Sequence, residues 1–243
     1  MVLDNHSAPR SLLLPPPYTA HWLAQGDTSG QACLLAPDHG AGTLVWHCSM
    51  PEPGRRADSA GRFDFAVVLE PDVPLCEARK AFVLGMLALG DALAAHCPPE
   101  RAVTFGWPSE LRLDAGRIGG MRLHLPEGVT EDEVPDWMVL GVELIADRDN
   151  LTDPGSKPGS VSLKEEDFTD PAAILESFAA YLMLNFDRMA HGGYAALAAR
   201  YGEKIAAGGT LTDTVDVQDA DGLARLKEAL TRAPWRDDAG PRL

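Results

Sequence analysis

Arginine and glycine recur in two stretches of the chain whose residue types suit a negatively charged ligand. Residues 53–62 contain Arg55, Arg56 and Arg62, and residues 105–121 contain Arg117 followed by Gly119 and Gly120. A guanidinium group can bind carboxylate or phosphate through paired hydrogen bonds, and glycine leaves backbone N–H groups accessible. The two stretches therefore predict an anion site. The alternative for residues 53–62 is a solvated loop with incidental arginines.

Residues 105–121 predict two strands joined by a turn. Trp107-Pro108 precedes the first of them, and such a pair is unusual beside a sheet because proline disrupts the hydrogen-bond ladder. Gly119-Gly120 fits a strand whose backbone must closely approach a flat ligand. The alternatives are a buried tryptophan at a sheet corner and a bulge at the glycine pair.

Glu143 interrupts an apolar run over residues 137–146. A carboxylate inside such a strand is costly unless it is paired or faces a cavity. Arg117 or Arg122 across the sheet is the expected partner, and a metal-ligand role for Glu143 is the alternative. The seven histidines form no HxxxH or HExxH pattern, so no metal site is predicted.

The composition narrows the class of partner. A net charge of −15 disfavours nucleic acid and anionic membrane surfaces, because both recruit basic side chains. Four cysteines without CxxC spacing indicate reduced thiols and a cytoplasmic location, and Cys48 is the one to test as a nucleophile. No targeting segment or membrane span is expected.

The periodicity of the chain predicts an α+β domain. Strands dominate the first half, and long helices interrupt or follow them, without regular βαβ alternation. There is neither a Gly-x-Gly-x-x-Gly fingerprint nor a P-loop. The expected strands cover residues 43–48, 63–69, 103–105, 111–113, 118–125 and 137–146, with one or two more in 210–217. The expected helices cover 20–36 (broken at its glycines), 74–96, 172–189, 194–205 and 223–230.

The stretch 105–121 resembles the signature of the biotin/lipoate protein ligases. That signature runs Lys-Trp-Pro-Asn-Asp, a strand, a turn, then a lysine followed by small residues and glycine. Here Gly106 and Arg117 stand in place of the two lysines, and Ser109-Glu110 stands in place of Asn-Asp. Residues 53–62 resemble a degenerate form of the family's Gly-Arg-rich loop. Residues 137–145 are similar to its Val-Gly-Ile-Gly-Ile-Asn-Val strand.

The resemblance covers roughly residues 15–206 and implies roles for particular residues. Arg117 would hold the ligand carboxylate at the catalytic position. An arginine there keeps the charge but not the geometry of an ammonium group. The resemblance further implies ligand-binding roles for Arg55, Arg56, Trp107, Pro108, Glu110, Gly119, Gly120, Gly141 and Glu143.

The implied fold is the largely antiparallel mixed sheet, backed by helices, of biotin ligases and class II aminoacyl-tRNA synthetases. Residues 1–208 would form the ligase-like domain, and residues 209–243 a small appendage or truncated domain. The implied reaction uses ATP and Mg to activate biotin or lipoate and transfers the acid to a lysine of a carrier domain. One alternative is an impaired relative that binds a cofactor, an acyl group or a carrier domain. Another is an ATP-independent acyltransferase. A homodimer is possible in each case.

Overall fold

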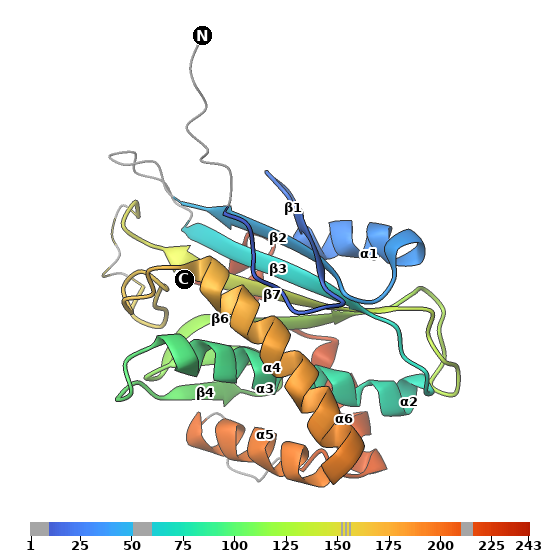
Figure 1. Cartoon of the computed structure of the whole chain (residues 1–243). Helices are drawn as coiled ribbons and strands as arrows, with labels where there is room; N and C mark the ends of the chain where they lie inside the picture. Colours follow the sequence, from blue (N-terminus) through green and yellow to red (C-terminus); the bar gives the residue numbers. More distant parts are fainter. Residues whose placement is uncertain (1–9, 51–59, 152, 154, 156, 210–215) are drawn as a thin grey trace.

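The computed structural model describes residues 10–50, 60–151, 153, 155, 157–209 and 216–243. Seven strands form one sheet in the order β1-β2-β3-β7-β6-β5-β4 (Figure 1). β1 is parallel to β2, and every other neighbouring pair in this sheet is antiparallel. The strands are β1 (Thr19–Trp22), β2 (Thr43–Ser49), β3 (Gly61–Leu69), β4 (Val103–Gly106), β5 (Glu110–Leu113), β6 (Gly116–His124) and β7 (Met138–Asp147).

Helices cover both faces of this sheet. The large core lies between the sheet and the pair α3 and α4, whereas α1 packs against β2, β3 and β7 on the opposite face. α5 packs beside β4 and α3. The helices are α1 (Thr28–His39), α2 (Leu75–Ala78), α3 (Lys80–His96), α4 (Pro171–Gly192), α5 (Ala195–Ala207) and α6 (Ala220–Leu230). The predicted mixed, largely antiparallel sheet backed by helices is confirmed.

Alternation along β3 assigns its residues to the two faces, because successive side chains in a strand point in opposite directions. Phe63, Phe65 and Val67 are fully buried in the core beneath α3 and α4. Ala66 and Val68 pack with α1 on the other face. Asp64 lies on that second face as well, beyond the part that α1 covers.

Two predicted helices differ from the structure. Residues 20–36 contain strand β1 and most of α1, because Thr19–Trp22 pairs with β2 and Gly26 turns the chain at φ 114°. Asp27 caps α1 by accepting a hydrogen bond from the Ser29 N–H at 3.0 Å. The predicted helix over 74–96 is two helices separated at Arg79, a buried residue that pairs with Glu131.

The C-terminal residues cross back over the sheet. After α6, the two-residue strands β8 (Arg236–Asp237) and β9 (Gly240–Pro241) pair with each other, and β9 contacts β6 and β7. Most of the strand predicted at 210–217 lies outside the described residues. No helix in the described part of the chain has the length and apolarity needed to cross a membrane.

Candidate ligand site

One row of residues crosses five strands on the face that carries α1. Register places Asp64 of β3 beside Glu143 of β7, Glu143 beside Gly120 of β6, and Gly120 beside Glu110 of β5, while His47 of β2 flanks Asp64. Facing residues of neighbouring strands point to the same side of a sheet. Three carboxylates and a glycine therefore share one surface, which we call the polar row (residues 47, 64, 143, 120 and 110).

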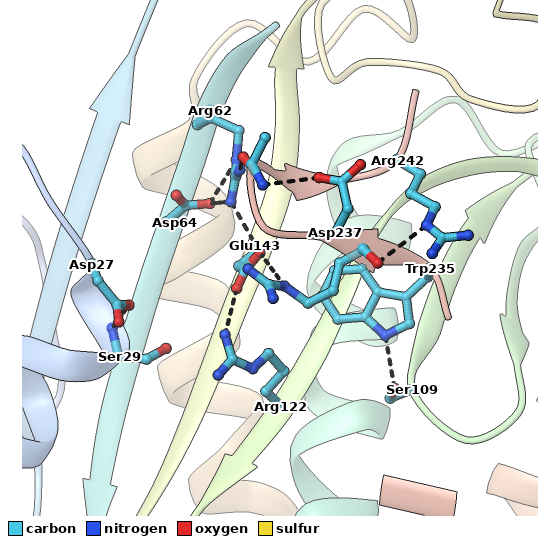
Figure 2. A network of polar contacts seen from close by, with 12 residues as sticks. Asp27, Ser29, Arg62, Asp64, Ser109, Arg122, Glu143, Trp235, Asp237 and Arg242 are labelled. Atoms are coloured by element: carbon cyan, nitrogen blue, oxygen red, sulfur yellow. Dashed lines mark hydrogen bonds and ion pairs between the residues drawn. The ribbon is translucent and has the colours of Figure 1, made fainter. Parts of the chain in front are cut away.

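Arginines surround Glu143 in this row (Figure 2). The Glu143 carboxylate accepts hydrogen bonds from Arg62 Nη2 at 3.1 Å, Arg236 Nε at 3.1 Å and Arg122 Nη1 at 3.2 Å. Its side chain is only 7% exposed, so these pairs lie where water screens them weakly. The sequence predicted Arg117 or Arg122 as the partner of Glu143; the structure shows Arg122, while Arg117 pairs with Glu110. A carboxylate shared by three guanidinium groups is also a poor cation ligand.

Asp64 shares Arg62 with Glu143. Arg62 Nη2 donates to Asp64 Oδ1 at 3.0 Å, but burial outweighs this contact and raises the pKa of Asp64 to about 6. Nearby on β2, burial and the Asp64 charge raise the pKa of the Cys48 thiol to about 11. The thiolate needed for nucleophilic attack is therefore scarce at neutral pH.

Arg117 lies at the other end of the row, beside Glu110. Its Nε is 3.3 Å from Glu110 Oε1, which also accepts a hydrogen bond from Arg112 at 2.8 Å. Its Nη1 donates to the Arg242 carbonyl oxygen at 3.2 Å. Arg117 does not reach Glu143, because the β5–β6 register places it opposite Arg112, two residues beyond Glu110 along β5.

The Trp107-Pro108 corner is held by α5. The Tyr201 hydroxyl donates a hydrogen bond to the Pro108 carbonyl oxygen, and the Tyr201 and Trp107 ring centroids are 6.3 Å apart. Trp107 lines a cleft with α6 residues Arg225, Glu228 and Ala229. The corner thus positions buried Ser109 and Glu110 at the row, while the role of Trp107 and Pro108 in ligand binding stays a prediction.

Three glycines admit close neighbours that a side chain would exclude. A Cβ at Gly119, where φ is 151°, would overlap the Glu143 carbonyl oxygen, and one at Gly141 would overlap Ser29 Oγ. A Cβ at Gly120 would lie 2.5 Å from Cε2 and 2.8 Å from Cδ2 of Trp235. In each case the close neighbour belongs to the same chain, and the predicted approach of a ligand to Gly119 and Gly120 stays a prediction. The flat group that lies against Gly120 is the indole of Trp235, from the same chain.

Sequence reasoning did not find Trp235, Arg236, Asp64 or His124 as members of this surface. A single tryptophan within the polar run 231–240 was the available signal for Trp235. His124 lies next to Gly141, and burial, followed by the charge of Arg122, lowers its pKa to about 4. Arg55 and Arg56 lie outside the described residues. Within the described ranges, no group of three or more histidine, cysteine or acidic side chains is arranged to hold a metal ion.

Comparison with known proteins shows the family to which the chain belongs. The family model "Biotin/lipoate A/B protein ligase family" matches residues 14–203, so the chain belongs to that family. A curated relative is the biotin–[acetyl-CoA-carboxylase] ligase of Paracoccus denitrificans. It is 29% identical over 165 residues, which cover 65% of this chain and 68% of the relative.

Solved structures of similar fold include a biotin protein ligase-like protein of unknown function from Silicibacter sp. TM1040. Its TM-score is 0.67 at 26% identity, with 80% of each chain covered. The biotin protein ligase of Aquifex aeolicus in complex with biotin and ATP has a TM-score of 0.56 at 16% identity. That match covers 76% of this chain and 78% of the other. The second likeness supports the fold alone.

Proposed function

We propose that this chain binds a biotin- or lipoate-type carboxylic acid together with ATP on the polar row. It would then activate the acid and transfer it to a lysine of a carrier domain. The observation that carries the proposal is the concentration of arginine at this surface of an acidic protein. Five guanidinium groups (Arg62, Arg112, Arg117, Arg122 and Arg236) contact three carboxylates (Asp64, Glu110 and Glu143). Within this set of contacts guanidinium groups outnumber carboxylates, and they still do when Arg236 is left out, so the cluster can accept an anion.

The chemistry of acid activation suits such a surface. A carboxylate oxygen attacks the α-phosphorus of ATP, an acyl-adenylate forms, and pyrophosphate leaves. Negative charge builds on the oxygens of the α-phosphoryl group and of the leaving pyrophosphate, and guanidinium donors fixed in advance can stabilise that charge. Arg62, Arg122 and Arg117 are the side chains we assign to this task. Magnesium would accompany the phosphates, since the described residues supply no metal cluster of their own.

Binding without activation is the second candidate, and the contacts of Arg117 favour it. Its guanidinium already has partners in Glu110 and the Arg242 carbonyl. The planar guanidinium of arginine also differs in shape from the compact ammonium of lysine, so it cannot keep the same contact with the oxygen that is transferred. Affinity would then survive while turnover is lost. Acyl transfer through Cys48 receives no support, because its raised pKa leaves little thiolate.

Acid-dependent pyrophosphate exchange with Mg-ATP tests the proposal. Biotin, lipoate and octanoate are compared in the natural protein, in Arg117→Ala and in Arg117→Lys. We expect exchange with one acid, a loss of at least about tenfold in Arg117→Ala, and retained or higher exchange in Arg117→Lys. Arg188→Ala on the exposed side of α4 is the matched control and should exchange like the natural protein.

The absence of exchange with all three acids in folded protein would contradict activation. Calorimetric binding of one acid in that same sample would then identify the second candidate. We further assign the acceptor as a biotinyl- or lipoyl-carrier domain in the cytoplasm. The family membership and the four free cysteines support that assignment.

A further inference from the structure

The C-terminal segment, residues 233–243, lies on the surface that the proposed ligand needs. Trp235 is fully buried, and its Nε1 donates a hydrogen bond to Ser109 Oγ at 2.8 Å (Figure 2). The two indole atoms nearest to Gly120, Cδ2 and Cε2, are those shared by the fused rings. The middle of the bicyclic ring, rather than its edge, therefore covers Gly120.

Three polar contacts fasten the rest of the segment to arginines and carboxylates of the same surface. Arg236 Nε donates to Glu143 at 3.1 Å, Arg62 Nη1 donates to the Ala239 carbonyl at 2.6 Å, and Arg117 Nη1 donates to the Arg242 carbonyl at 3.2 Å. The segment thus occupies two of the three guanidinium groups assigned above to the ligand, those of Arg62 and Arg117. Its own secondary structure is one pair of two-residue strands, which is weak by itself.

We propose that the C-terminal segment is a built-in competitor, so that Trp235 and a flat ring-bearing acid or its adenylate bind the same place above Gly120 in turn. This inference rests on the proposed function for the identity of the ligand. Gly120 has no side chain, and a ring can lie on its backbone only when the indole has left. Departure of Trp235 also frees Ser109 as a hydrogen-bond acceptor and releases Arg62 and Arg117 for the anionic end of the ligand.

The apparent affinity for the acid equals its intrinsic affinity multiplied by the fraction of molecules in which the segment has left the site. If the segment is bound for 90–99% of the time, apparent affinity falls by about tenfold to a hundredfold. Variants that weaken the segment should recover that loss. They should do so without adding any contact to the ligand.

Trp235→Ala removes the competing ring directly. Calorimetry with biotin, lipoate and octanoate should give a Kd at least about tenfold lower than that of the natural protein for the acid that binds. Met183→Ala, which truncates a side chain that is 38% exposed on α4, on the opposite face of the sheet, is the control and should leave the Kd unchanged. Free indole should bind Trp235→Ala but not the natural protein, because it can fill the vacated space.

Gly240→Ala displaces the segment without altering Trp235, in case Trp235→Ala does not fold. Gly240 has φ +122°, a backbone conformation that alanine adopts only with strain, so the substitution weakens the segment itself. The added Cβ would also push the end of the flexible Arg62 side chain aside. Gly128→Ala is the control for a positive φ, because Gly128 has φ +78° and no atom within 4 Å of the added Cβ. Gly240→Ala should bind the acid about threefold to tenfold tighter than Gly128→Ala does.

The outcomes separate this inference from the proposed function. Equal Kd values in the natural protein, Trp235→Ala and Gly240→Ala would overturn competition while leaving acid binding intact. If no acid binds any variant, the proposed function fails. Competition for these acids then fails with it, because binding of indole to Trp235→Ala would show only that a flat ring can fill the space above Gly120.

Discussion

The two faces of the sheet use the same strands for opposite purposes. On the face beneath α3 and α4, β3 and β7 present Phe63, Phe65, Val142 and Leu144, all fully buried. On the other face, one residue further along, the same strands present Asp64 and Glu143 with their arginine partners. The period of two in a strand lets one segment build a core and a charged surface together.

The two faces differ in the interactions that a substitution removes. The core face is stabilised by removing apolar surface from water, so its residues contribute by volume and fit. Burying the charges of the polar row costs solvation free energy. Ion pairing, rather than apolar packing, offsets that cost. We expect substitutions on the core face to cost the most stability, and substitutions on the polar row to cost less stability and to affect ligand binding as well.

The largest loss of stability is expected for a substitution on the core face. Phe65→Ala should lower the free energy of unfolding by about 3–5 kcal/mol, because Phe65 is fully buried and its ring centroid is 5.0 Å from that of Phe178. Urea denaturation measures the change. The neighbouring Ala66→Gly, in the same strand but facing α1, should cost only about 1 kcal/mol. A similar loss in both variants would show that the faces do not differ as described.

An intermediate effect is expected in the polar row. Glu143→Gln should lower the free energy of unfolding by about 2–3 kcal/mol, because three guanidinium groups lose their shared charge partner. Asp187→Asn, whose side chain is 66% exposed in an i,i+4 pair with His191, is the control and should shift stability by less than about 0.5 kcal/mol. If the urea midpoint of Glu143→Gln were unchanged, the prediction would be wrong, and the three arginines would have found other partners.

The smallest effect is expected for His124, which lies beside Gly141 between the polar row and α1. The folded-state pKa of His124, about 4, lies below its usual value, so the unfolded chain binds more protons between pH 4 and 6.5. Stability is therefore lost as pH falls through that window, and His124→Gln should remove about 1–2 kcal/mol of the loss. Denaturation curves at pH 4.5 and 7 test this. His191→Gln, at an 80% exposed position, should not change the pH dependence.

Local pattern was enough to predict most of the fold. Alternation of Phe63, Phe65 and Val67 identified β3 and its core face, and apolar periodicity identified α3 and α4. It did not identify β1, because Thr-Ala-His-Trp has no strong strand signal and becomes a strand by pairing with β2. Nor did it identify the break at Arg79, which depends on Glu131 in a distant loop.

The candidate site was predictable only where its partners are strand neighbours. The pairing of Glu143 with Arg122 follows from a polar residue in an apolar strand and an arginine on the next strand. The contact between Trp235 and Ser109 spans 126 positions, and no local pattern encodes it. The roles assigned to Arg117, Trp107 and Glu110 rest on resemblance and await the binding and exchange measurements.

The position of Trp235 in the sequence has a consequence for the order of synthesis. The strands that carry the polar row are complete once residue 147 has been made, whereas its cover depends on residues 235–242. A ribosome therefore makes the arginine-rich surface before it makes the segment that covers that surface.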